Sequence, residues 1–253
     1  MNHFFRFFVI ASASLFSANA VSDGHESTEN PAVASIANQC FIKDGIDSDD
    51  IEDAMKSLSK WAKKYHPGIL SVLTPVFRAD SEGYGDIIIQ SWMPFGSLGD
   101  FDQAIMENGE DVREDLNEVM DCGDSSLGGW FNYYMSESMQ QIENGLISYQ
   151  HCEINEGVPA SKVVEYNNQE AENLKTNQFN GLLAFMDRGV GDRNLPGDYS
   201  KIYAFPDMDS FSKGANGFWN NGGWEFEEEV RMNAANCSSG NMYRFETLHI
   251  ADQ

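Results

Sequence analysis

The sequence predicts an α+β fold made of two tandem β-α-β-β-α-β units. Landmarks recur in one order: Cys40, Gly85-Asp86 and Pro94 return at one constant spacing as Cys152, Gly197-Asp198 and Pro206, and Cys122 returns at a slightly longer spacing as Cys237. Self-similarity at a nearly fixed spacing indicates an internal repeat. Hydrophobic patterns of period 2 and period 3.6 also alternate in the same order in both stretches. We therefore expect a first repeat over residues 37–140 and a second over 146–253.

The first helix of the first repeat is expected over residues 49–65. Its apolar side chains recur every three or four residues and form one face, made of Ile51, Met55, Leu58, Ala62 and Tyr65. Asp47 or Ser48 can cap the helix at its start, and the sequence His66-Pro67-Gly68 ends it.

The remaining elements follow the same logic. In the first repeat we expect strands at 38–43, 69–77, 86–93 and 130–135 and a helical region over 98–119. The second repeat is expected to have strands at 151–154, 182–186, 199–205 and 242–250, and helices over 160–174 and 208–230. This order is that of the ferredoxin-like split βαβ plan.

The first twenty residues are expected to direct export. Arg6 precedes an apolar run over residues 7–16, and Ala18-Asn19-Ala20 has the small-x-small pattern of a cleavage site. A membrane anchor is the alternative, but the run is shorter than the roughly 20 apolar residues that span a bilayer. We therefore predict a signal peptide over residues 1–20, a flexible leader over 21–36, and a periplasmic or secreted protein with no membrane attachment after cleavage.

Composition and charge exclude some partners. The chain has 253 residues, with 16 Lys and Arg against 40 Asp and Glu, a net charge of −24. Such an acidic surface repels nucleic acid and anionic lipid, which require clustered positive charge. An apolar content of 42% is that of a folded protein rather than a disordered one.

Export changes how the four cysteines are interpreted. In an oxidising compartment an even number of cysteines suggests disulfides, here with three possible connectivities. The β-α-β-β-α-β plan brings the first strand close to the segment before the last strand. The repeat therefore predicts the bridges Cys40–Cys122 and Cys152–Cys237, one in each copy.

Two such units in tandem, with the segments SWMPFGSLGDFDQA and YAFPDMDSFSKGA after their third strands, resemble the dimeric α/β-barrel superfamily. The resemblance implies that the two sheets pack face to face as a pseudo-dimeric barrel within one monomeric chain. The superfamily includes cofactor-free monooxygenases, small isomerases and cyclases, haem-dependent enzymes and members without known activity. The fold therefore leaves the function open, and no motif in the sequence selects one branch.

No common catalytic motif is present, so the candidates are isolated polar residues. Asn167 interrupts the apolar stripe of Val163, Ala171 and Leu174, and its counterpart in the first repeat is Met55. A buried amide needs partners, so Asn167 either contacts a ligand in a cavity between helix and sheet or bonds nearby backbone. On the first interpretation, Asn167→Met abolishes ligand binding without loss of stability.

Two histidines form a second candidate. If the first and last strands of the second repeat pair with residue numbers that sum to about 400, His151 lies opposite His249 and Glu153 opposite Thr247. Such a group could bind a metal or transfer protons, and the alternative is two histidines at the rim. We commit to no metal site, because a register slip of one residue separates the pair.

Other candidates are Arg188, which could hold an anionic ligand or pair with carboxylates, and three residues among aromatic side chains: Trp92, Asn132 and Trp219. Trp219 lies in the glycine-rich segment GANGFWNNGGW, which could form a mobile flap. An aromatic cavity with a few amides suits a flat apolar ligand. We expect the pocket to be built mainly from residues 151–250.

The sequence thus predicts an exported protein that binds a small aromatic or hydrophobic molecule. Catalysis is left open; an enzyme of this kind would resemble the cofactor-free monooxygenases, cyclases or isomerases, with no metal or organic cofactor. The alternative is a non-catalytic periplasmic or secreted interaction protein whose aromatic residues are all core. A cavity of at least about 300 Å³ lined by the candidate residues distinguishes the first from the second.

Overall fold

The computed structural model describes residues 33–78, 85–140, 142–187, 189–190 and 197–251. In these residues, nine strands form one antiparallel sheet in the order β7-β6-β4-β1-β3-β2-β9-β5-β8, and an additional β5–β7 pairing closes the first eight into a barrel. The strands are β1 (Val33–Ile42), β2 (Ile69–Phe77), β3 (Ile87–Pro94), β4 (Met120–Met135), β5 (Asn144–Ile154), β6 (Leu182–Asp187), β7 (Tyr199–Phe205), β8 (Ala235–Cys237) and β9 (Asn241–Ile250).

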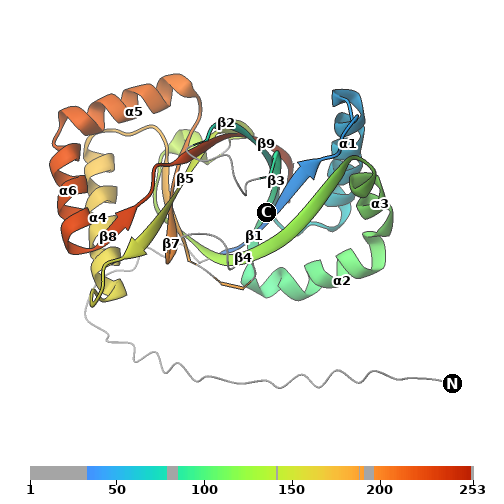
Figure 1. The fold of residues 1–253 in the computed structure, drawn as a ribbon, viewed down its shortest axis with the longest axis horizontal. Helices are drawn as coiled ribbons and strands as arrows, with labels where there is room; N and C mark the ends of the chain where they lie inside the picture. The colour runs from blue at the N-terminus through green and yellow to red at the C-terminus, as the bar shows by residue number, and fades with distance from the viewer. Residues whose placement is uncertain (1–32, 79–84, 141, 188, 191–196, 252–253) are drawn as a thin grey trace, which may run out of the picture.

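Each half of the chain supplies four neighbouring strands of the barrel. The first half contributes β4-β1-β3-β2 and the second contributes β9-β5-β7-β6. The halves meet at two seams, where β2 pairs with β9 and β4 pairs with β6. Figure 1 shows the strands as a ring in the middle of the molecule. The protein therefore has an α+β fold with a closed antiparallel barrel.

Helices cover the outside of the barrel on two opposite sides (Figure 1). On one side lie α1 (Ser48–Tyr65), α2 (Leu98–Asn108) and α3 (Glu110–Val119), and on the other α4 (Ala160–Thr176), α5 (Met208–Asn220) and α6 (Gly223–Asn233). Two short 3₁₀ turns occupy Phe95–Ser97 and Glu137–Met139. None of the helices in the described ranges is long and apolar enough to cross a lipid bilayer.

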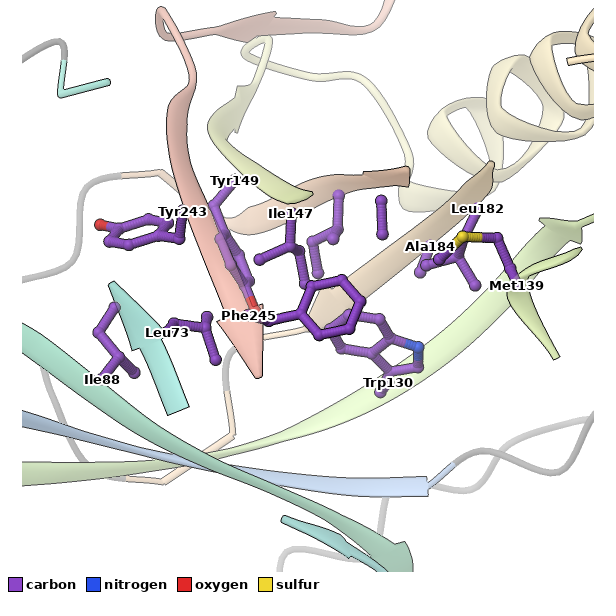
Figure 2. Close-up of a cluster of buried hydrophobic side chains, with 12 residues drawn as sticks. Leu73, Ile88, Trp130, Met139, Ile147, Tyr149, Leu182, Ala184, Tyr243 and Phe245 are labelled. Atoms are coloured by element: carbon purple, nitrogen blue, oxygen red, sulfur yellow. The ribbon is translucent and has the colours of Figure 1, made fainter. Parts of the chain in front are cut away.

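Side chains from all around the ring fill the middle of the barrel. The buried cluster includes Leu73, Ile147, Ile202, Tyr243 and Phe245, several of which Figure 2 shows pointing towards one another. A chain of two hydrogen bonds crosses this interior. Gln90, which is 1% exposed, donates through Nε2 to Ser35 Oγ at 3.0 Å and accepts through Oε1 from the Tyr149 hydroxyl. Because these groups satisfy one another, the interior tolerates their burial.

Helix α1 matches its predicted signals. Asp47 is the N-cap, and it forms a reciprocal capping box with Asp50. Leu58 and Ala62 are buried as expected, together with Ala54, while Tyr65 is 38% exposed. The buried face of α1 therefore follows Ala54, Leu58 and Ala62, and is rotated away from the end of the predicted stripe at Tyr65.

Several predicted boundaries are wrong for reasons of tertiary pairing. Strand β1 begins at Val33, within the segment predicted as a leader, because residues 33–36 pair with both β3 and β4. The two long helical regions are each broken, at Gly109 and at Asn221-Gly222, where Gly222 has a φ of +85°. Strand β4 starts ten residues earlier than predicted, and the expected last strand is preceded by the short strand β8.

Both predicted disulfides are confirmed. Cys40 on β1 bonds Cys122 on β4, and Cys152 on β5 bonds Cys237 on β8. In each case the two cysteines occupy directly opposite positions of neighbouring strands. Each bridge thus ties the first strand of a half to a strand near the end of that half.

Removing either bridge as a Cys→Ala pair is expected to lower the free energy of unfolding by about 4 kcal/mol, because each closes a loop of more than 80 residues in the unfolded chain. Urea unfolding of the Cys40→Ala/Cys122→Ala and Cys152→Ala/Cys237→Ala variants measures this. The control is non-reducing peptide mapping of the unmodified protein. A bridge between the two halves, or free thiols in the oxidised protein, would contradict the assignment.

Candidate functional site

A cavity of about 580 Å³ lies at one end of the barrel. The end is defined by the start of β1, β2 and β6 and the end of β3, β4 and β9, which the antiparallel pairing brings to the same rim. All eight barrel strands contribute to its wall. The wall includes Trp92, Trp130, Asn132, Ala204, Ser71 and Thr247.

Two tryptophans and one amide form the most specific part of this wall. The rings of Trp92 and Trp130 meet edge to face, with centroids 5.5 Å apart. Trp130 Nε1 donates a hydrogen bond to Asn132 Oδ1 at 2.7 Å. Because an indole nitrogen can only donate, the carbonyl oxygen of Asn132 must face Trp130, which leaves the amide NH₂ to donate elsewhere. Trp92 Nε1 is buried without a hydrogen-bond partner among the described residues.

The other polar side chains of the cavity are already paired. Ser71 Oγ and Thr247 Oγ1 lie 3.1 Å apart across the seam between β2 and β9. No charged side chain occurs among the described lining residues. Among the described lining side chains, the Asn132 amide NH₂ is therefore a donor that faces the cavity, whereas the Trp92 N–H is buried within the wall. Such a wall suits a neutral apolar molecule that presents a hydrogen-bond acceptor.

Residues 66–68, before β2, and residues 249–251, at the end of β9, are joined by hydrogen bonds beside the cavity. His66 Nδ1 accepts from the Gly68 amide at 3.1 Å, His249 Nε2 donates to the His66 carbonyl at 3.1 Å, and the Ala251 amide donates to the Gly68 carbonyl at 3.0 Å. Gly68 lies so close to β3 that a Cβ atom would meet the Trp92 carbonyl oxygen at 2.0 Å. A side chain at this position would push the cavity rim apart.

His66 is buried and neutral rather than a charged cap. It is 4% exposed and its ring packs edge to face on Phe101 at 5.1 Å. Burial, with a smaller effect of nearby His249, lowers the pKa of His66 to about 4. Since Nδ1 accepts a hydrogen bond, the proton of the neutral ring lies on Nε2. His66 is the C-cap of α1, as the sequence predicts for the end of this helix, and its neutral ring adds no positive charge there.

The predicted pairing of His151 with His249 is also wrong. Residues of β5 and β9 pair with numbers that sum to 390, as in Tyr149 opposite Asn241, not to about 400. His249 lies beyond the start of β5 and pairs with Leu70 of β2. His151 is buried, with Nδ1 3.0 Å from Ser200 Oγ. Within the described residues, no group of three His, Cys, Asp or Glu side chains is arranged to hold a metal ion.

Of the other predicted site residues, the structure brings Trp92 and Asn132 to the cavity and places two elsewhere. Asn167 is buried on α4, which packs on the outer face of the sheet, and its amide lowers the pKa of the Tyr133 phenol against the larger, opposite effect of burial. Trp219 is 50% exposed at the end of α5. Arg188 lies outside the described residues.

The cavity does not belong mainly to residues 151–250, contrary to our expectation. From that range the wall includes Leu182, Ala204, Phe245, Thr247 and Ile250, while most of it comes from earlier in the chain. The reason is closure of the barrel, which gives each strand of both halves one inward face.

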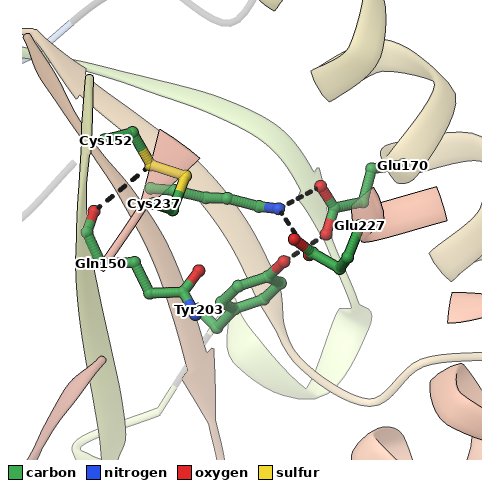
Figure 3. A network of polar contacts seen from close by, with 7 residues as sticks. Gln150, Cys152, Glu170, Tyr203, Glu227 and Cys237 are labelled. Carbon is green, nitrogen blue, oxygen red and sulfur yellow. Dashed lines mark hydrogen bonds and ion pairs between the residues drawn. A yellow bond between two sulfur atoms is a disulfide. The ribbon is translucent and has the colours of Figure 1, made fainter. Parts of the chain in front are cut away.

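Sequence reasoning missed a buried charged cluster on the outer face of the second half (Figure 3). Lys201 of β7 lies 2.7 Å from Glu170 of α4 and 3.3 Å from Glu227 of α6. The Tyr203 hydroxyl donates to Glu170. Lys201 and Glu170 are both almost completely buried. The signal for Glu170 was present, since it lies three positions after Asn167 on the same helix face.

This cluster holds α4 and α6 against the sheet through charge. Burial alone would lower the pKa of Lys201, but Glu170 and the other neighbouring groups outweigh it and hold that pKa well above its ordinary value. Burial and the Glu170 charge raise the pKa of Tyr203. Lys201 is therefore a cation and Tyr203 a neutral donor at neutral pH. At the spacing that relates Cys40 to Cys152, the first-half counterparts of Glu170 and Lys201 are Leu58 and Ile89, which are apolar and pack together.

Comparisons with known proteins relate this chain by fold. No family model matches the sequence, and no curated protein does. Among solved structures, a haem-binding protein from Thermus thermophilus is similar with a TM-score of 0.52 and 9% identity, covering 85% of this chain and 91% of that one. A candidate monooxygenase from Fusobacterium nucleatum subsp. nucleatum has a TM-score of 0.55 and 11% identity, covering 88% and 95%. A mutant chlorite dismutase from Candidatus Nitrospira defluvii has a TM-score of 0.54 and 8% identity, and the match covers 85% of this chain and 92% of that one.

These similarities show that the chain has the fold of the dimeric α/β-barrel proteins. One of these structures is of a haem-binding protein, so the residues of the cavity wall can be compared with the residue types that hold haem iron. Haem iron is held through His, Cys, Tyr or a Met paired with His. The described wall of the barrel cavity offers Met93, Met135 and Met139 but none of the other three residue types. Its residues therefore do not fit an axial haem ligand set.

Replacing Lys201 and Glu170 together with apolar residues should cost less stability than replacing Lys201 alone. Lys201→Ile alone leaves Glu170 charged and buried, so we expect a loss of about 3 to 5 kcal/mol in the free energy of unfolding. Lys201→Ile/Glu170→Leu restores the residue types found at Ile89 and Leu58 and should recover most of that loss. Urea unfolding followed by circular dichroism tests both. A single variant as stable as the double variant would show that the charges are not coupled.

Stability should fall in mild acid because of His66. Its folded-state pKa of about 4 lies below the usual 6.5, so the unfolded chain binds the proton more readily. The effect is absent above about pH 6.5 and grows as the pH falls towards 4, reaching about 3 kcal/mol. Urea unfolding at pH 7 and pH 4.5 should show a smaller pH dependence in His66→Asn than in the unmodified protein.

The matched control is His249→Gln, which removes the neighbouring imidazole and leaves His66 in place. It should retain most of the pH dependence, because burial is the larger cause of the shift at His66. Equal pH dependence in His66→Asn and the unmodified protein would contradict the assignment.

Proposed function

We propose that this is an exported protein that binds a small, neutral aromatic or hydrophobic molecule in the barrel cavity and, where it is an enzyme, acts without a metal or organic cofactor. One observation carries the proposal: a cavity of about 580 Å³ whose described wall is largely apolar and presents the amide NH₂ of Asn132, whose carbonyl oxygen accepts from Trp130. The volume is within the range of small-molecule sites.

The Asn132 amide defines the chemistry of the ligand further. An acceptor such as a carbonyl or quinone oxygen would satisfy the Asn132 amide, and the flat ring system would lie against Trp92 and Trp130. A carboxylate is disfavoured because the described wall has no cation to compensate its desolvation. The cavity at one end of the barrel also supports this function over a non-catalytic interaction protein, for which we would expect that end to be packed with side chains as the middle of the barrel is.

We further propose that the two halves arose by tandem duplication of a ferredoxin-like unit, with residues 37–140 and 146–253 as the original repeats, and that residues 1–20 are removed on export. The equivalent strand orders and equivalent disulfides of the halves support the first proposal. Two disulfides without a free cysteine in the described residues support an oxidising, periplasmic or extracellular location.

The binding proposal is tested with 2-methyl-1,4-naphthoquinone and the carbonyl-free analogue 2-methylnaphthalene, using quenching of tryptophan fluorescence and calorimetry. We expect the quinone to bind about tenfold more tightly, as one hydrogen bond to the half-buried Asn132 amide allows. Asn132→Leu should remove this preference, and Ala204→Phe should block both probes by filling the cavity.

Asn167→Met is the matched control, because Asn167 lies outside the cavity; its binding should be unchanged. The proposal fails if neither probe binds, or if binding is indifferent to both Asn132→Leu and Ala204→Phe. Native mass spectrometry of protein purified from its own host would then identify any retained molecule.

A further inference from the structure

Two tryptophans are exposed together on the helical layer of the second half. Trp219 near the end of α5 is 50% exposed, and Trp224 near the start of α6 is 69% exposed (Figure 1 shows the helices). Their ring centroids are 6.0 Å apart with an angle of 51° between the planes. Adjacent indoles open to solvent indicate an interaction site rather than core packing.

The pair rests on a packed aromatic base. The Phe218 ring contacts Trp219 at 4.9 Å and Phe226 at 6.5 Å. Gly223 approaches the Phe218 ring so closely that a Cβ atom would meet it at 2.3 Å. Trp219 and Trp224 therefore form a supported platform at the α5–α6 turn.

A groove of about 320 Å³ adjoins this platform between the end of α4 and α5. Phe218 lines the groove and its ring also contacts Trp219, so the groove and the platform share this residue. The groove is lined by neutral amide and hydroxyl groups, including Asn173, Asn177, Gln178, Asn180 and Ser210. Asn177 donates to Asn173 and Asn180 donates to Ser210, so the Gln178 side chain is the amide of this set that these bonds leave for a ligand. Its cation, Lys213, is paired with Asp209 at 2.6 Å.

Gln178 occupies this groove at a conformational cost. The Phe179 amide bonds the Leu174 carbonyl and the Gln178 amide bonds the Lys175 carbonyl, which is the Schellman arrangement that ends α4. Gln178 stands where glycine is usual and has a φ of +53°, the only non-glycine residue with positive φ in the described ranges. A side chain kept in a left-handed conformation is often functional.

We propose that the platform and the groove together bind a neutral oligosaccharide. A sugar ring has an apolar face that can stack on an indole, and hydroxyl groups that both donate and accept, as side-chain amides do. The net charge of −24 disfavours anionic polymers. The first half differs here: the counterpart of Trp219 at the spacing of the repeat is Glu107, and the groove beside α1 is lined by charged side chains.

The test uses the full disulfide-bonded chain and four neutral probes: cellohexaose, maltohexaose, chitohexaose and mannohexaose. Calorimetry and indole fluorescence should detect binding of at least one. Trp219→Ala and Trp224→Ala should each weaken it about tenfold or more, as loss of a central aromatic contact does. The matched control, Met232→Ala, removes an equally exposed apolar side chain of α6 and should leave affinity unchanged.

Gln178→Gly separates a binding role from a structural one. It removes the strained conformation, so the melting temperature should stay the same or rise while affinity for the bound hexasaccharide falls. The proposal is overturned if none of the four probes binds or if the tryptophan variants bind normally. It is also overturned if the exposed pair instead mediates self-association, seen as a dimer in sedimentation that Trp219→Ala and Trp224→Ala abolish.

Discussion

Closure of the barrel constrains every other part of the structure. Each half supplies four strands, and an isolated four-stranded sheet would leave the edges of β2 and β4 unpaired. Pairing of β2 with β9 and of β4 with β6 satisfies those edges and gives each strand one inward and one outward face. The inward faces then have to fill a common interior, and the outward faces need a helical cover. The cavity is the part of that interior which the side chains leave open.

Local signals predicted what depends on local physics. Strands β2 and β7 begin and end at the predicted residues, and the capping signal of α1 at Asp47 is correct, because hydrophobic alternation and capping are encoded within a few residues. The first part of β4 was not predicted as a strand, because residues 120–129 are rich in glycine and serine. They are a strand through pairing with β1, and Gly128 is needed because a Cβ atom there would meet the Asp187 carbonyl oxygen at 2.4 Å.

The candidate site was harder to predict because strand register is not local. If Cys152 and Cys237 are opposite each other, the residue numbers of paired positions sum to 389. The observed sum is 389 between β5 and β8, where the disulfide lies, and 390 between β5 and β9. Applied as a constraint, the disulfide would have excluded the pairing of His151 with His249. Strand β9 also pairs with β2 along its other edge, and its last residues extend beyond the pairing with β5, which brings His249 to His66. Trp92 and Asn132 were found because strand aromatics and amides are visible in the sequence, but their shared cavity depends on closure.

The two faces of the barrel wall differ in how freely they can change. An inward residue such as Ala204 or Trp130 borders the common interior, so a change there affects strands of both halves. An outward residue meets the helical layer, in which α1 also packs on β9 and α4 on β4 across the seams between the halves. Leu58 and Ile89 in the first half are apolar where Glu170 and Lys201 of the second form an ion pair, and Glu107 stands where the second has Trp219. Polar chemistry specific to one half therefore accumulates on the outer layer, whereas the barrel cavity is a property of the whole chain.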